Sequence, residues 1–226
     1  MTSTSTDKSF KIGDIDGKVA GGSLQGTIVA HVDTNPRYQA DLSLNDAALA
    51  RLMLPPSASD EDRKKIGTGR VSATLALQQT FGDASGKGAE RTGRGDLIVR
   101  DGKIYNVPLA MGLMQLVTLR LPVAGSFDHA TMSYYLRDNK VTFERILLES
   151  AGINLAGMGT MSLKSSPPTL DLNFITETPN EFYLPLISDF IAFTRKELLL
   201  QVQVPGPVND PKITPVPLTP IAGTLK

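Results

Sequence analysis

The sequence predicts a protein dominated by β-strands, with an antiparallel meander sheet and a few short amphipathic helices. Short β-prone runs recur along the chain and are separated by Gly, Asn-Asp and Pro residues, which favour turns. Only three segments have apolar residues at helical spacing. At 226 residues the chain is long enough to bury a sizeable core, so we expect one elongated domain.

The first half of the chain carries runs in which apolar and polar residues alternate, as they do from Tyr38 to Leu44. Such a period of two indicates a sheet with one buried face and one face in water. Asp101 and Gly102 are typical of a tight type I′ turn, and we expect them to join two strands in a hairpin. The strands expected here are 10–19, 23–32, 37–44, 69–80, 96–100 and 103–107.

The second half of the chain predicts a meander followed by a last strand. Asp138 and Asn139 favour the first of its turns. The strands expected here are 126–137, 140–149, 152–163, 169–176 and 200–204. Residues 205–226 are rich in Pro and can run extended, but they cannot pair in the middle of a sheet. We therefore expect a disordered tail over 1–9, a β domain over 10–204 and an extended tail over 205–226.

Helical spacing is confined to three segments, 47–53, 109–117 and 182–199. Asn45 or Asp46 can cap the first, which Pro55 and Pro56 stop. The polar stretch 57–65 predicts a loop. The Gly-rich stretch 81–95 predicts a flexible turn and not a phosphate-binding loop, because it leads into a strand and not into a helix.

Composition excludes several classes of function. Lys and Arg number 23 and Asp and Glu number 23, so the formal net charge is zero and nucleic acid is an unsuitable partner. The chain has no Cys and only two His, which leaves no His-rich or thiolate metal site. Asp14 and Asp16 have no third ligand, and Asp138 and Asp210 lie in expected turns. We expect no enzyme, no metal and no cofactor.

The order of these elements resembles the C-terminal region of the AsmA family, which includes TamB-like and other bridge-like envelope proteins. Its centre is GRGDLIVRDGKIYNVPLAMGLMQLVTLRLP (93–122), a strand, an Asp-Gly turn, a second strand and a short apolar helix. Further matching stretches are GKVAGGSLQGTIVAHVD (17–33), DLSLNDAALARLM (41–53), LLESAGINLAGMGTMSL (147–163) and VQVPGPVNDPKITPVPL (202–218). The resemblance covers roughly 12–218. The chain departs from the family at its front, where the usual inner-membrane helix and long β repeat are missing and no signal peptide is evident, so we expect a fragment or a shortened relative.

The resemblance implies a curved sheet that forms an open, apolar trough for phospholipid acyl chains. It implies phospholipid transport between membranes and outer-membrane homeostasis, on the periplasmic side of a bacterial cell envelope, with inner- or outer-membrane proteins as further partners. The residues expected to line the trough are Leu97, Val99, Met132, Tyr134, Leu136, Ile146, Leu148, Ile153 and Leu155. Leu113, Leu116, Leu186 and Phe190 are expected on helices that cap it.

Three alternatives stay open. The same strand residues can form a closed core in place of a trough. Exposed strand edges near 82–95 can template a client β-chain, as TamB-like proteins are thought to do for outer-membrane proteins. The remaining alternative is an enzyme whose surface site has no recognisable motif.

Overall fold

The computed structural model describes residues 9–32, 36–66, 68–82, 87–102, 127–150, 154–177 and 200–217. These residues form one antiparallel sheet of eleven strands and two short helices. Each strand pairs with the strand that precedes it and the strand that follows it in the chain, so the sheet is a meander from end to end. The expectation of an all-β protein with an antiparallel meander sheet is confirmed.

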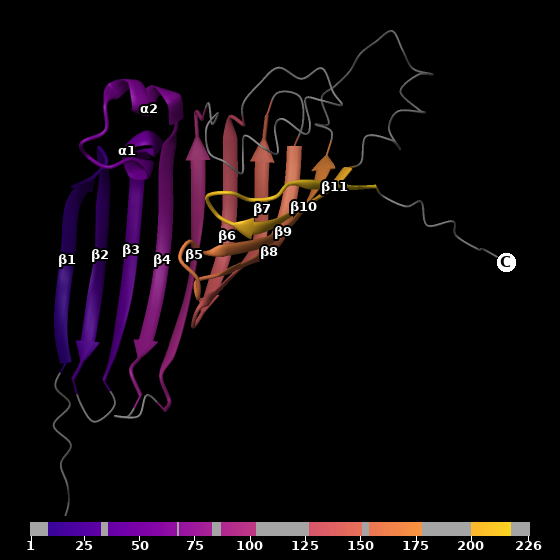
Figure 1. The fold of residues 1–226 in the computed structure, drawn as a ribbon. Coiled ribbons are helices and arrows are strands. Elements are labelled where there is room, and N and C mark those ends of the chain that lie inside the picture. The colour runs from indigo at the N-terminus through magenta and orange to yellow at the C-terminus, as the bar shows by residue number, and fades with distance from the viewer. Residues whose placement is uncertain are drawn as a thin grey trace, which may run out of the picture.

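Figure 1 shows the strands upright at the β1 end and progressively tilted toward the C-terminus, until β10 and β11 cross the direction of β1. The first five strands are β1 (Ser9–Val19), β2 (Gly22–His31), β3 (Arg37–Ala48), β4 (Arg70–Thr80) and β5 (Glu90–Arg100). The remaining six are β6 (His129–Arg137), β7 (Lys140–Glu149), β8 (Asn154–Ser162), β9 (Thr169–Glu177), β10 (Leu200–Pro207) and β11 (Thr214–Pro217). The helices are α1 (Leu49–Met53) and α2 (Asp60–Ile66).

Tight turns set the register of two hairpins, and the second of them is the Asp138-Asn139 turn that the sequence predicts. Ala20 and Gly21 have φ angles of 51° and 84°, and this left-handed pair closes the β1–β2 hairpin. Asp138 has a φ of 52° and begins the β6–β7 turn. Arg91 on β5 donates hydrogen bonds to the Asp138 carbonyl (2.7 Å) and to Asn139 Oδ1 (2.9 Å), so a neighbouring strand holds this turn.

The helix expected over 47–53 is present in part as α1, which begins at Leu49 because β3 runs to Ala48. The cap expected at Asn45 or Asp46 is wrong: Ala48 is the N-cap and makes no side-chain cap hydrogen bond.

The loop expected over 57–65 is also wrong, because α2 occupies most of it. Ser59 caps α2: its Oγ accepts the N–H of Asp62 (3.1 Å) and donates to the Asp62 carboxylate (2.7 Å). The first turn carries three acidic residues, which the helix dipole favours. The two other expected helices, 109–117 and 182–199, lie outside the described residues.

The Gly-rich stretch 81–95 is only partly a turn, because β5 begins at Glu90. The strand expected over 96–100 is the last part of β5, and the strand expected over 103–107 lies outside the described residues. Leu97, Ile98 and Val99 pair with β4 on one side and with β6 on the other. The N–H of Gly102 donates to the carbonyl of Asp128 (2.9 Å), which leads into β6.

The sheet continues past residue 204. β10 runs to Pro207, and β11 pairs with β10 alone. Pro215 and Pro217 therefore lie on an edge strand, where a missing N–H costs least.

The core lies on one face of the sheet, mainly over the C-terminal strands. Phe127, Leu155, Phe174, Val202 and Val204 are its fully buried apolar side chains, and they belong to one cluster. Burial of each such side chain contributes about 1.5–3 kcal/mol, so this cluster supplies a large part of the stability of the sheet.

We expect Phe174→Ala to lower the free energy of unfolding by about 3–5 kcal/mol, because it opens a cavity in this cluster. The matched control is Ile175→Ala on the same strand, since Ile175 points to the other face and is 46% exposed while Phe174 is 0% exposed. The control should cost less than about 1 kcal/mol. Denaturant unfolding followed by circular dichroism measures both, and equal losses would contradict this placement of the core.

Candidate functional site: an apolar face across the sheet

Strand register places apolar residues from successive strands on the same side of the sheet. Leu44 pairs with Ala73, Ala73 with Leu97, Leu97 with Met132 and Met132 with Ile146. Directly paired residues point to the same side of a sheet, so this row crosses five strands without a break. We call this side the apolar face. Parallel rows add Leu24, Ile28, Leu42, Leu75, Leu77, Val99, Tyr134, Leu136, Val141, Phe143, Leu148, Leu155, Met161, Leu172, Phe174, Val202 and Val204.

Eight of the nine residues expected to line a trough lie on the apolar face. They are Leu97, Val99, Met132, Tyr134, Leu136, Ile146, Leu148 and Leu155. The ninth, Ile153, lies outside the described residues. So do the four residues expected on capping helices, Leu113, Leu116, Leu186 and Phe190.

Burial along the apolar face is graded from one end of the sheet to the other. Ile146, Leu148, Leu155 and Phe174 are no more than 6% exposed and pack against one another in the core cluster. On β2, β3 and β4 the leucines and isoleucines of the same face are only partly buried: Leu24, Ile28, Leu42, Leu44, Leu75 and Leu77. The face therefore has a packed half, over β7–β10, and an open half formed by these Leu and Ile side chains of β2–β4, whereas Ala40 on β3 and Val71 on β4 are buried.

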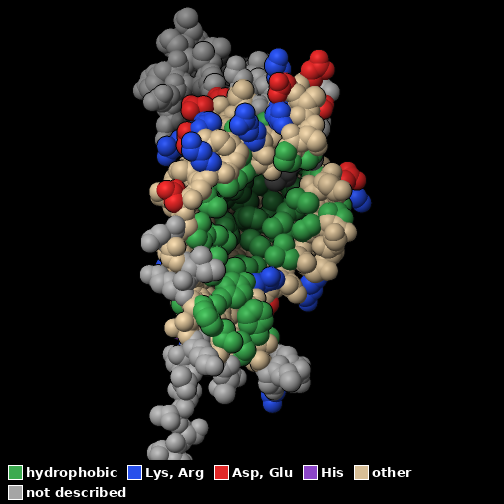
Figure 2. All heavy atoms as spheres, turned by 90° about the vertical axis from the view of Figure 1, so that its left-hand side faces the viewer, with side chains coloured by type: hydrophobic (Ala, Val, Ile, Leu, Met, Phe, Trp, Pro, Cys, Tyr) green, Lys and Arg blue, Asp and Glu red, His purple; other side chains and the backbone are tan. Residues whose placement is uncertain are grey.

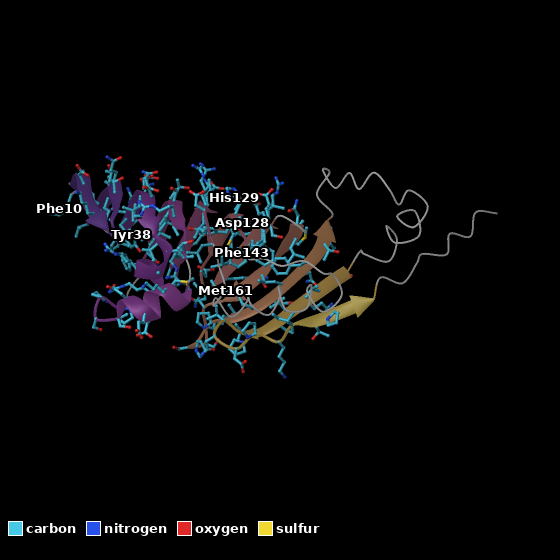
Figure 3. The ribbon with its side chains drawn as sticks, turned by 90° about the horizontal axis from the view of Figure 1, so that it is seen from above. Phe10, Tyr38, Asp128, His129, Phe143 and Met161 are labelled. Atoms are coloured by element: carbon cyan, nitrogen blue, oxygen red, sulfur yellow. The ribbon has the colours of Figure 1, made fainter. Side chains whose placement is uncertain are left out.

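The open half is visible from the β1 side of the molecule. Figure 2 shows hydrophobic side chains lining a hollow in that direction, with Lys, Arg, Asp and Glu gathered above it. In Figure 3, Phe143 and Met161 lie on the inner side of the curved sheet and His129 on the outer side. The inner side of the curve is thus the apolar face.

Tyr134 lies where the two halves of the apolar face meet. Its ring crosses Gly95 on the neighbouring strand, where an added Cβ would lie 2.7 Å from the Tyr134 hydroxyl. It also contacts Phe143 edge-on, with ring centroids 6.4 Å apart. Burial raises the pKa of the Tyr134 phenol, and the nearby carboxylate of Asp96 raises it further.

The outer side of the sheet is polar and carries two adjoining depressions of about 650 and 470 Å³. Both are lined by Asp41 and Arg94. In the larger, Ser133 donates a hydrogen bond to Asp96 (2.7 Å), and the backbone N–H of Asp96 donates to Thr74 (3.1 Å). The sequence analysis did not predict these depressions, because polar lining residues such as Thr74, Arg94 and Asp96 are ordinary outward positions of alternating strands.

The histidines and acidic residues form no chemical centre within the part of the chain that the structure describes. No group of three or more His, Cys, Asp or Glu side chains there could hold a metal ion. His31 is on β2 and His129 is on β6, four strands away. They lie near opposite ends of the strands: His31 is in register with Glu90 at the start of β5, whereas Ala130 next to His129 pairs with Val99 near its end. His129 lies 3.9 Å from Glu149 on the outer side of the sheet. Among the described helices, none combines the length and apolar character needed to cross a membrane.

Comparison with known protein families finds no matching family, and comparisons with curated proteins and with solved structures find no match either.

We expect Asp96→Asn to lower the pKa of Tyr134 without returning it to the ordinary tyrosine value, because burial is the larger cause of the shift. Titration of the tyrosine signals by NMR measures this pKa. Asp41→Asn, a change on the same outer side, is the control and should leave it unchanged. A Tyr134 pKa that does not respond to Asp96→Asn would refute the proximity of the two groups.

Proposed function

We propose that this protein is a non-enzymatic envelope protein of the AsmA type, which carries phospholipid between membranes by holding acyl chains against the open half of the apolar face. A single observation supports this proposal most directly. Six leucine and isoleucine side chains on three adjacent strands remain partly exposed on the same face of one sheet: Leu24, Ile28, Leu42, Leu44, Leu75 and Leu77.

Contiguous apolar surface of this kind is costly in water, and an acyl chain is a suitable cover for it. Each methylene group that leaves water contributes about 0.8 kcal/mol. The strands β2 to β4 span two spacings, about 10 Å. One leaflet of a bilayer has a hydrocarbon thickness of about 15 Å. An extended acyl chain is longer than the open half is wide, so it would lie along the strands and not straight across them.

The graded burial narrows the set of residues that we propose for lipid contact. Leu97, Met132, Tyr134 and Leu136 are partly exposed and border the open half, so they stay in the set. Val99, Ile146, Leu148 and Leu155 are at most 6% exposed and belong to the closed core. The proposal therefore assigns the trough to the open half and the closed core to the packed half.

A second candidate function is a scaffold for the assembly of outer-membrane or secreted β-proteins. Edge strands near 82–95 cannot serve, because β5 lies in the interior of the sheet between β4 and β6. The candidate edge is β1, an eleven-residue strand whose outer side pairs with no strand among the described residues. A photo-crosslinker on β1 should capture newly made β-barrel protein in cells if this function is the right one.

The lipid proposal predicts that Leu77→Glu abolishes lipid capture while the protein stays folded, because the charge enters the open half. Gln78→Glu is the matched control, since Gln78 is the next residue on β4 and is exposed on the outer side. Native mass spectrometry of the purified protein counts the bound phospholipid, and circular dichroism reports folding.

In contrast, Ile146→Glu buries an uncompensated charge in the packed half and should unfold the protein. A wild-type protein that purifies free of lipid, and that takes up none when phospholipid is added, would refute the proposal. Equal lipid capture by Leu77→Glu and Gln78→Glu would refute it as well.

A further inference from the structure

The open half of the apolar face continues into exposed apolar side chains at one end of the strands. Phe10 on β1 pairs with Ala30 on β2, and Ala30 pairs with Tyr38 on β3. Val32 lies two positions beyond Ala30. Phe81, the residue after β4, has its ring centroid 5.9 Å from that of Tyr38, and its N–H donates to the carbonyl of Pro36 (3.0 Å). We call Phe10, Val32, Tyr38 and Phe81 the apolar rim.

Three of the four rim side chains are more than half exposed to solvent, although all three are apolar. Phe10 is 61% exposed, Val32 54% and Phe81 53%. Figure 2 shows hydrophobic side chains extending from the hollow to the lower end of the same view, below the charged cluster at the top. Exposed apolar side chains gathered at one end of a sheet mark a contact surface.

We propose that the apolar rim inserts into the interfacial region of a lipid bilayer and brings the open half of the apolar face into line with the acyl chains of the membrane. This inference rests on the proposed function in one respect, because it assumes that the open half of the apolar face binds a lipid. Aromatic side chains suit this region of a bilayer, because their rings are apolar and rigid.

The size of the rim favours a bilayer over a second copy of the chain. A large apolar side chain presents on the order of 150–250 Å² when fully exposed, so the three most exposed rim residues together offer roughly 300 Å². A stable protein interface needs about 800 Å² from each partner. Interfacial insertion has no such minimum, since its strength grows with the apolar area that enters the membrane.

The segments around the rim carry little net charge. The segments 32–37 and 81–91 carry three acidic and three basic residues, and the segment 7–11 around Phe10 carries Asp7, Lys8 and Lys11. Their sum is +1, and one positive charge near an anionic surface contributes about 1 kcal/mol, or roughly fivefold in affinity. The rim should therefore bind neutral bilayers, with only a small gain from anionic lipid.

The opposite end of the strands supplies an internal control. α1 follows the other end of β3, eleven residue steps or about 36 Å from Arg37. It exposes Leu52 (39%) and Met53 (43%), and charged residues of α2 lie beside it. These two side chains resemble the rim residues in exposure and differ from them in position.

Sedimentation with phosphatidylcholine vesicles tests the proposal. We expect the Phe10→Ser, Phe81→Ser double variant to bind vesicles at least roughly tenfold more weakly than the wild type, because two exposed phenyl rings no longer leave water on binding. The Leu52→Ser, Met53→Ser double variant should bind as the wild type does. Adding phosphatidylglycerol to the vesicles should strengthen wild-type binding by no more than roughly fivefold, the effect of one net positive charge.

Several outcomes would overturn the proposal. They are a wild type that does not bind neutral vesicles, equal losses in the two double variants, binding that requires phosphatidylglycerol, and a stable dimer in solution that the Phe10→Ser, Phe81→Ser change dissociates. Circular dichroism confirms that both variants fold, which is expected because all four substituted side chains are exposed.

The same variants separate this proposal from the lipid-carrier function. Phospholipid bound by the protein in the absence of membranes is counted by native mass spectrometry. Vesicle binding that depends on the rim, without phospholipid bound to the purified protein, would support membrane insertion by the rim and refute the lipid-carrier function. Bound phospholipid without rim-dependent vesicle binding would support the lipid-carrier function and refute membrane insertion by the rim.

Discussion

The structure depends on an unbroken antiparallel register that keeps one face apolar across successive strands. Side chains alternate across a strand with a period of two, so a slip of one residue in any hairpin would turn the apolar side chains of every later strand outward. Tight turns prevent such slips at Ala20-Gly21 and at Asp138-Asn139. In the second of these, Arg91 of β5 binds the turn between β6 and β7, which ties the register of three strands together.

Where a register shift does occur, the strand also bends and the apolar face is kept. The β7 ladder shifts between Phe143 and Ile146, yet both of these side chains stay on the apolar face opposite β8. The β3 ladder shifts between Leu44 and Ala47, with Asp46 at a φ of 57° and bound by the guanidinium of Arg70. That hydrogen bond holds the pKa of the Asp46 carboxyl below its ordinary value. Bulges of this kind increase local twist, which is one source of the curvature that Figure 1 shows.

Local sequence was sufficient to predict where most strands lie. It was insufficient where residues far along the chain determine which strands pair. Tyr38 to Leu44 and 169–176 show their period of two directly, and both lie in strands. The sequence predicts β5 only from residue 96, whereas the strand begins at Glu90. Gly93 and Gly95 have no side chains that could show the alternation. Leu77 and Tyr134 pack against these glycines from the neighbouring strands. The pairing of β5 with β6, nearly thirty residues later in the chain, could not be predicted from the local Asp101-Gly102 turn. α2 could have been found, since Ser59 and Asp62 have the spacing of a helix cap.

The division of the apolar face into a packed and an open half could not be read from alternation, because β4 and β9 alternate in the same way. Burial depends on how tightly the sheet curves and on which strands pack together, and both are tertiary properties. The division also assigns different tasks to the two halves. The packed half contains the side chains whose loss costs most, so it can keep the sheet folded while the open half leaves apolar surface uncovered. A ligand that binds the folded open half and not the unfolded chain adds stability in proportion to its occupancy. An occupied open half would then resemble the packed half, with acyl chains in the place that Phe174 and Val202 fill beside β8 and β9.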